Sequence, residues 1–368
     1  MSKKIAQTEV THELGRQRRG ARRVTMTDVA REAGCSQATV SFVLNNAPGI
    51  RLSAETRARV VSAARKLGYA VAGVPHTGAG SANRVIGFVV DQLATSPEAM
   101  VAIEGVSQAA RADGSFVLVS QTFNDVAVEK DVVRQLVGSG AAAIVYMTIF
   151  TREVELPDDL AELELPIYLL NCYTADQAFP AVIPSEVAGG QRCTRYLIEH
   201  GHSRIATITG ELWMEAAQDR LKGYRRALAT ADIPFDPDLV VEGDWSASSG
   251  FEGTCKLLSL DEPPTAIFCQ NDRTAIGCYE ALKEAGLVIP TDMSVVGYDD
   301  EEIARHLHPQ LTTSVLPHRA MGQWVIEQMQ ETNGVRLSRY PLVKLECPLV
   351  ERASVSTPPV QVRPVAAQ

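Results

Sequence analysis

The sequence lacks any hydrophobic run long enough to cross a membrane. Its longest strongly apolar stretch, Ala141 to Phe150, is far shorter than the ~20 residues that a spanning helix needs. Because Gly138 and Gly140 precede it, we interpret it as a buried strand. The basic N-terminus is followed by no apolar segment of the kind that secretory signals contain. We therefore expect neither a membrane protein nor an exported one, and predict a cytoplasmic location.

The sequence also lacks the common signatures of enzymes and metal sites. Its seven cysteines are scattered and form no C-x-x-C pair, which argues against a zinc site or a disulfide framework. The motifs G-x-S-x-G, G-x-x-x-x-G-K-[ST] and H-E-x-x-H are absent. Residues 200–202, with the sequence His-Gly-His, are typical of a helix C-terminus rather than of a metal site. We predict a protein that is not an enzyme and that uses no cofactor or metal.

The charge is unevenly distributed along the chain. The net charge of −9 by itself argues against nucleic-acid binding. However, residues 1–70 contain 13 Lys and Arg against 5 Asp and Glu, a net of +8, which leaves −17 for the remainder. A basic block on an acidic body is typical of a small phosphate-binding module joined to a larger domain.

Residues 24–70 contain three short helical patterns. The first begins at Thr25 and stops at Gly34, the second begins at Ser36, and the third follows Ser53. Two helices separated by so short a turn predict a helix-turn-helix, in which the second helix enters the major groove of DNA. The alternative is an ordinary three-helix packing unit. The helical period turns four side chains of the second helix outward: Gln37, Ala38, Ser41 and Phe42.

Composition sets the remaining boundaries. Residues 1–23 are basic and lack apolar periodicity, so we predict a disordered extension that either touches phosphate or has no function. Residues 71–84 are rich in Gly and form a predicted linker or hinge. Residues 354–368 are a predicted disordered tail without a leucine heptad.

Residues 85–353 alternate short apolar runs with amphipathic helices. This alternation predicts an α/β architecture with mostly parallel sheets. The strand-like runs fall into two series, which indicates two doubly wound lobes. We expect the chain to cross between the lobes near residues 179–184, 311–316 and 343–347.

Polar side chains follow several of the predicted strands, where open parallel sheets bind ligands. Carboxylates, amides, a guanidinium and an indole suit a small polyhydroxylated ligand, since the polar groups bind hydroxyls and the indole stacks on a ring. The alternative for single residues such as Asn271 is helix capping. The candidates are Asp91, Asn171, Asn271, Asp272, Asp299 and Asp300, with Arg220 and Trp245 near helix starts.

Several motifs resemble one known family. Residues Val24–Ser41 closely resemble the headpiece signature of the lac repressor (LacI/GalR) family of bacterial transcription regulators. The resemblance covers about residues 24–353. It continues at Ser53–Arg57, Leu67–Tyr69, Leu197–Ile205, Arg220–Tyr224, Asn271-Asp272, Ser294–Asp300 and Leu311–Thr313.

The resemblance implies an effector-controlled DNA-binding regulator, usually a repressor. Its fold would be an N-terminal helix-turn-helix headpiece plus a two-lobed doubly wound core like that of periplasmic binding proteins. Its partners would be double-stranded operator DNA, a small-molecule effector and a second copy in a homodimer. Effector binding would change the orientation of the lobes and thereby the spacing of the headpieces.

The resemblance also assigns residues to the two sites. Those matching base-reading positions are Gln37, Ala38 and Phe42, and those matching other DNA contacts are Thr25, Thr27, Ser36, Thr39, Ser41, Asn45 and Tyr69. The effector-site residues that the resemblance assigns are Asn171, Arg220, Trp245, Asn271 and Asp299, and the position after the first predicted strand adds Asp91.

Some positions depart from the family pattern. The hinge position that usually carries a groove-inserting Leu is about Gly78, and Pro75 and His76 precede it, so we expect a weak hinge helix that bends DNA less. Asn171 replaces a charged effector contact, which indicates a different sugar or glycoside. A solute-binding protein without DNA function is the alternative, but it predicts an export signal and no basic headpiece.

Overall fold

The computed structural model describes residues 25–44, 53–67, 84–93, 97–112, 114–157, 160, 165–332 and 337–359. The chain divides into two compact units, Met1–Gly80 and Ser81–Gln368. The predicted N-terminal extension, the hinge and the last part of the predicted tail lie outside the described residues. None of the helices in the described ranges is long and apolar enough to cross a membrane.

The first unit contains the three predicted helices, α2 (Met26–Ala33), α3 (Gln37–Leu44) and α4 (Ala54–Leu67). A capping box starts α2 at the predicted residue, because the Thr25 hydroxyl accepts from the Asp28 backbone N–H and the Asp28 carboxylate accepts from that of Thr25. Helix α2 ends at Gly34, whose φ of 64° lies in the left-handed region. The Ser36 hydroxyl then accepts from the Thr39 N–H, 3.1 Å away, and starts α3. Local sequence signals thus set the short turn of the helix-turn-helix.

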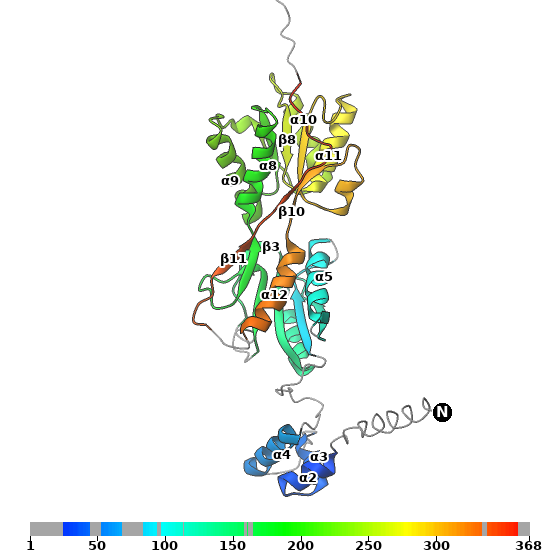
Figure 1. Cartoon of the computed structure of the whole chain (residues 1–368), viewed down its shortest axis with the longest axis vertical. Helices are drawn as coiled ribbons and strands as arrows, with labels where there is room; N and C mark the ends of the chain where they lie inside the picture. Colours follow the sequence, from blue (N-terminus) through cyan, green and yellow to red (C-terminus); the bar gives the residue numbers. More distant parts are fainter. Residues whose placement is uncertain are drawn as a thin grey trace, which may run out of the picture. The chain divides into compact units, whose positions relative to one another are not determined.

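Helices α2, α3 and α4 lie together in one small bundle (Figure 1), and an apolar core holds them together. Val29, Val40 and Val60 come from different helices, and each is fully buried. Burying these side chains leaves the opposite face of α3, where Gln37 is exposed, available to a partner. Alanines at 30, 33, 63 and 64 complete the contact and let the helices approach closely.

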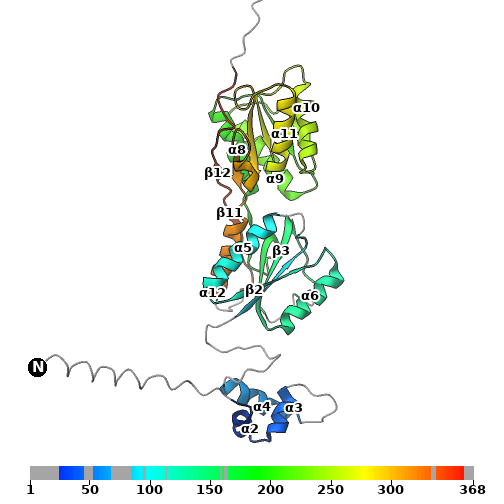
Figure 2. The ribbon, with the colours of Figure 1, turned by 90° about the vertical axis from the view of Figure 1, so that its right-hand side faces the viewer.

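The second unit contains two lobes, each built on a six-stranded sheet. Lobe 1 has the strand order β11-β5-β4-β3-β1-β2, and all of these neighbours are parallel. Helices α5 (Pro97–Ala112) and α12 (His318–Thr332) cover one face of the sheet, and α6 (Val126–Gly138) covers the other (Figure 2). The strands are β1 (Val85–Val90), β2 (Phe116–Gln121), β3 (Ala141–Glu153), β4 (Ile167–Tyr173), β5 (Ala181–Pro184) and β11 (Leu342–Leu345).

Lobe 2 has the strand order β12-β10-β9-β8-β6-β7, with only the short β12 antiparallel. Its strands are β6 (Ile205–Thr209), β7 (Val240–Glu242), β8 (Ala266–Cys269), β9 (Ser294–Asp299), β10 (Thr312–Val315) and β12 (Leu349–Val350). Two helix pairs cover opposite faces of this sheet (Figure 1). They are α8 (Glu186–Glu199) with α9 (Glu215–Thr230), and α10 (Ala247–Leu258) with α11 (Asp272–Glu284). The two 3₁₀ helices are η1 (Pro237–Leu239) and η2 (Glu302–Arg305).

The chain passes between the lobes after β5, after β10 and after β11. These passages bring the C-terminal ends of both parallel sheets to the same region, where a ligand site is expected. The structure confirms the predicted fold class, a helix-turn-helix unit followed by a two-lobed α/β core.

The prediction of a disordered tail from residue 354 is wrong for residues 354–359. Ser354 is fully buried, and its hydroxyl donates to the Val295 carbonyl and accepts from the Thr312 N–H. The Val295 N–H in turn donates to the Ser354 carbonyl at 2.9 Å. The Ser- and Pro-rich composition suggested disorder, but these polar groups complete the hydrogen bonding of the lobe 2 sheet.

Removing residues 354–368 is expected to lower the free energy of unfolding by at least about 3 kcal/mol, since the three buried hydrogen bonds of Ser354, roughly 1 kcal/mol each, are lost together with those of Ser356. Urea unfolding of the two C-terminal truncations measures this. Removing only residues 360–368 is the matched control, because it deletes none of these bonds. Equal stabilities for the two truncations would contradict the structural role of Ser354.

We expect His202 to make the free energy of unfolding of lobe 2 depend on pH. The ring is 2% exposed and bonds Thr265, Ser294 and the Ser356 carbonyl, and burial lowers its pKa below the ordinary 6.5. Its contribution to stability is present above pH 6.5 and is lost as pH falls toward the folded pKa, at most about 1.4 kcal/mol per pH unit. Urea unfolding at several pH values should show a smaller acid loss for His202→Gln, whereas the exposed His306→Gln should behave like the wild type.

Candidate functional site

The structure describes only some of the residues that are predicted to contact DNA. Thr25, Thr27 and Gln37 are exposed. The hydroxyls of Ser36 and Thr39 lie 2.9 Å apart and take part in the cap of α3, so both residues also have a structural role. Ala38, Ser41 and Phe42 lie on α3, but their side chains are outside the described part of the structure, as are all atoms of Asn45 and Tyr69.

A cavity of about 260 Å³ lies between the two lobes of the second unit. It is lined by the C-terminal ends of strands from both sheets and by the starts of the helices that follow them. Five of the six predicted effector residues line this cavity: Asn171, Arg220, Trp245, Asn271 and Asp299. Asp91 does not line it.

Arg220 is the central group of the cavity wall. Its Nε and Nη2 atoms each donate to Glu186 at 2.9 Å, a bidentate pair in which both side chains are buried. Nη1 donates to the Gln270 carbonyl and lies 3.4 Å from Asp299 Oδ1. The guanidinium also lies 3.9 Å from the centre of the Tyr298 ring. These contacts hold the guanidinium plane in one orientation in the cavity wall.

The pKa values around Arg220 reflect this burial. Burial by itself lowers the pKa of Arg220, but the carboxylates of Glu186 and Asp299 raise it above its ordinary value, so the group stays charged. Burial raises the pKa of Asp299 well above the ordinary range, and Arg220 opposes this rise. A hydroxyl-bearing ligand that hydrogen-bonds to Asp299 would stabilise its charged form.

Trp245 and Asn271 form a second side of the cavity. Asn271 caps α11 by accepting from the Thr274 N–H, and its amide donates to the Trp245 carbonyl at 3.0 Å. The indole N–H points to the Met214 sulfur, 3.1 Å away. The Asn271 amide oxygen therefore has a capping role, while the amide nitrogen positions the loop that carries the indole. The half-buried indole ring lies within the wall of the cavity.

Asn171 and Asp91 organise the end of β3. The Asn171 amide donates to the Thr148 and Ile149 carbonyls and accepts from the Thr151 hydroxyl, so its polar atoms hold the irregular part of β3. The Asp91 carboxylate accepts from the Ile149 N–H at 3.0 Å and pairs with Arg152. Burial raises the pKa of Asp91, opposed by these two contacts.

Three of the predicted effector residues have positive φ angles: Asn171 at 60°, Trp245 at 68° and Asp299 at 109°. Asn and Asp adopt positive φ angles more readily than most residues, so Trp245 is the one of these three with clear backbone strain, which is typical of ligand sites.

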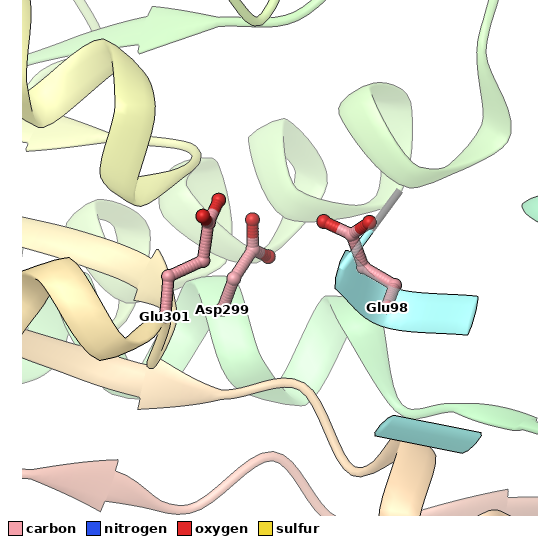
Figure 3. A group of neighbouring side chains, drawn as sticks. All are labelled: Glu98, Asp299 and Glu301. Carbon is pink, nitrogen blue, oxygen red and sulfur yellow. The ribbon is translucent and has the colours of Figure 1, made fainter. Parts of the chain in front are cut away.

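Sequence reasoning missed several charged residues of the cavity. Glu186 was not expected to pair with Arg220, because the first turn of a helix is a usual place for an acid. Arg273 pairs with Glu301, 3.1 Å away. Glu98 comes from the start of α5 in lobe 1 and faces Asp299 and Glu301 of lobe 2 (Figure 3). Its position directly after the loop that follows β1 was the only signal that could have identified it.

Comparison with known proteins shows the family of the chain. Residues 25–71 match the family described as bacterial regulatory proteins, lacI family, and residues 194–355 match the periplasmic binding protein-like domain. The chain is 32% identical to the HTH-type transcriptional repressor PurR of Vibrio atlanticus over 339 residues, which cover 90% of this chain and 99% of that protein. The chain belongs to the lacI family of bacterial regulatory proteins.

Other LacI-family proteins match over similar lengths. The ribose operon repressor of Haemophilus influenzae is 30% identical, over 90% of this chain and 98% of its own length. The structure of the lac repressor dimer bound to operator and the anti-inducer ONPF matches with a TM-score of 0.62 and 31% identity, covering 90% of this chain and 99% of that one. This LacI-family chain is therefore a DNA-binding transcriptional repressor with an effector-binding core, and not an enzyme.

Proposed function

We propose that this repressor is controlled by a neutral sugar or glycoside that binds in the cavity between the lobes. The observation that carries the proposal is the pair of Arg220 and Asp299 beside the indole of Trp245 in one cavity wall. A fixed guanidinium and a carboxylate hydrogen-bond to hydroxyls, and an indole stacks on the apolar face of a sugar ring. A CelR–cellobiose complex, 28% identical with a TM-score of 0.63 over 90% of this chain and all of that one, supports a carbohydrate.

The charges of the cavity support a ligand without negative charge. Five carboxylates but only two guanidinium groups line it. Both guanidinium groups already form ion pairs, Arg220 with Glu186 and Arg273 with Glu301. A phosphorylated or carboxylated sugar would meet surplus negative charge in a site of low dielectric constant. We therefore expect neutral sugars to bind more tightly than their phosphates.

A thermal-shift screen of neutral sugars, glycosides and nucleosides tests the effector proposal. A sugar that raises the unfolding temperature of the wild type should lose this effect in Asp299→Ala and in Arg220→Ala. Asp131→Ala, which removes an exposed carboxylate on α6, should keep it. If stabilisation by the sugar survives both cavity substitutions, the ligand binds elsewhere.

We propose that α3 of the first unit reads bases and that the other assigned residues hold the DNA backbone. The exposed Gln37 is the described side chain best placed for this role, since an amide can bind adenine bidentately. Binding to random duplex DNA should weaken steeply with salt, with a log–log slope of about −0.9 for each phosphate contacted. Gln37→Ala should reduce the preference for operator over random DNA and leave that slope unchanged. This activity would take place at the chromosome in the cytoplasm.

We propose that the core dimerises through the edge of lobe 1. Strand β2 is an edge strand, and its Phe116 and Leu118 are 61% and 43% exposed. Met100, Phe123 and Val126 on neighbouring segments are exposed as well. An apolar edge of this kind normally marks an interface, and the lac repressor structure that this chain matches is a dimer.

Leu118→Glu is expected to convert the dimer to a monomer, because it places a charge within the proposed apolar interface. Sedimentation velocity measures the mass directly. Asp131→Glu, on the surface of α6, is the matched control and should leave the mass unchanged. A Leu118→Glu protein that remains dimeric would place the interface on another surface.

A further inference from the structure

Three carboxylates from the two lobes converge where the lobes meet, and two of them, Glu98 and Asp299, line the cavity. Glu98 lies in the first turn of α5 in lobe 1, Asp299 ends β9 in lobe 2, and Glu301 follows two residues later. One oxygen of each lies within 4.8 Å of the others, and the side chains face one another across the gap between lobes (Figure 3). We propose that these carboxylates bind a divalent cation of the Ca²⁺ type, which joins lobe 1 to lobe 2.

The spacing of the oxygens fits such an ion. Calcium binds oxygen at about 2.3–2.6 Å, so two ligands on opposite sides of one ion lie up to roughly 5 Å apart. The three oxygens fall within that limit. Carboxylates prefer hard cations such as Ca²⁺, Mn²⁺ and Mg²⁺, and the spacing favours the larger ones because Mg²⁺ requires about 2.1 Å.

The charged groups around the three carboxylates have a net negative charge. The nearby acids are the three proposed ligands, Glu186 and Asp272, and the nearby bases are Arg220 and Arg273. Five carboxylates and two guanidinium groups leave an excess of negative charge, which a divalent cation would reduce. Arg220 and Arg273 each contact one of the proposed ligands, so the ion would bind on the side of the carboxylates that faces Glu98.

An independent observation also indicates a ligand at this place. His318, at the start of α12, lines the same cavity, and its side chain is 2% exposed. Its Nε2 atom is buried and has no hydrogen-bond partner in the described part of the structure. Burial lowers the pKa of the His318 ring, and Glu98 is the charged group that opposes this lowering most strongly. A buried imidazole nitrogen without a partner is normally satisfied by a ligand or an ordered water. His318 is not among the three side chains whose ligand atoms lie within 4.8 Å of one another, so a water bound to the ion would join its Nε2 atom to the site.

Such a site goes beyond the proposed sugar site, although it shares Asp299 with it. Because one ligand comes from lobe 1 and two from lobe 2, an ion here would favour one relative orientation of the lobes. The cation would then change the equilibrium on which an effector acts. The proposal does not depend on the identity of the sugar.

Calorimetric titration of the full-length, EDTA-treated protein with CaCl₂ and with MnCl₂ tests the site, without sugar or DNA. We expect one bound ion per chain, a higher unfolding temperature with the ion, and at least tenfold weaker binding in both Glu98→Gln and Glu301→Gln. These variants keep the size of the side chain, and circular dichroism confirms their folding. Asp131→Asn, which neutralises an exposed carboxylate on α6, should bind like the wild type.

No binding up to about 10 mM, which is above the range of weak protein calcium sites, would overturn the proposal. Equal binding by the wild type and Glu98→Gln would overturn it as well, since the ion would then occupy another group of acids. Either result leaves the proposed sugar site standing, because that site is tested separately by the sugar screen. Conversely, a failed sugar screen would not affect the outcome of the metal titration.

Discussion

Arg220→Ala is expected to abolish the response to the effector and to lower the free energy of unfolding of the core by about 3–5 kcal/mol. The substitution removes a guanidinium that is 4% exposed and leaves Glu186, also buried, without its bidentate partner. Asp299 loses a contact at 3.4 Å, and the Gln270 carbonyl loses its donor. Uncompensated buried carboxylates account for most of the expected loss.

Urea unfolding and effector titration measure the two consequences separately. Arg220→Lys provides a second variant in case alanine prevents folding. It keeps the charge but cannot form the bidentate pair, so we expect an intermediate loss of stability and the loss of effector binding. Arg195→Ala is the matched control, because Arg195 forms an exposed pair with Glu199 on α8. Wild-type stability in Arg220→Ala would contradict the role given to the buried pair.

The DNA-binding unit should not respond to the loss of Arg220. The helix-turn-helix is a compact unit of its own with a separate core. Arg220→Ala should therefore keep the salt-dependent binding to random DNA. A loss of this binding at temperatures where the core remains folded would contradict the independence of the two units.

Gly277→Ala is expected to have the second-largest effect. A Cβ at Gly277 of α11 would lie 1.8 Å from the Ala247 carbonyl oxygen and 2.6 Å from the Phe251 nitrogen, both in the backbone of α10. A Cβ at Gly250 of α10 would likewise lie 2.1 Å from the Thr274 carbonyl oxygen of α11. The two helices pack backbone against backbone, so a methyl group must push them apart. We expect a loss of about 3 kcal/mol, the upper end of the usual range for overpacking.

This substitution should also weaken effector binding. Helix α10 follows the loop with Trp245, helix α11 begins at Asn271, and the two residues are joined by the hydrogen bond at 3.0 Å. Separating the helices displaces the indole from its position in the cavity. Thermal unfolding and effector titration measure both effects. Gly138→Ala, at the end of α6, is the control, since a Cβ there meets no described atom within 4 Å. Equal unfolding temperatures for both variants would mean that α10 and α11 can separate without penalty.

Much of the fold could be predicted from the sequence, because the signals are local. The Thr25–Asp28 capping box, the Gly34 stop and the Ser36 cap depend on residues within a few positions of one another, and the structure contains all of them. Strand β3 contains the apolar stretch Ala141 to Phe150 that the sequence predicted as a buried strand, since a buried parallel strand is apolar along most of its length. The tail was the exception, because the partners of Ser354 are distant in the sequence.

The candidate site was less predictable. The rule that ligands bind beyond the C-terminal ends of parallel strands identified Arg220, Asn271 and Asp299, and all three line the cavity. The same rule included Asp91, whose carboxylate instead holds Ile149 and Arg152. Whether a polar side chain at a strand end faces a cavity or the backbone of a neighbouring strand depends on twist and register, which one strand alone does not encode.

The sequence by itself determined that a basic helix-turn-helix precedes an acidic α/β body, since caps, periodicity and charge depend only on neighbouring residues. It also identified the family, because the headpiece signature lies within one continuous segment. Only the tertiary structure decided which charges meet. Glu186 reaches Arg220, and Glu98 of lobe 1 faces Asp299 and Glu301 of lobe 2. These contacts depend on the passage of the chain between lobes, which places residues far apart in the sequence around one cavity, where the low dielectric constant makes their charges interact strongly.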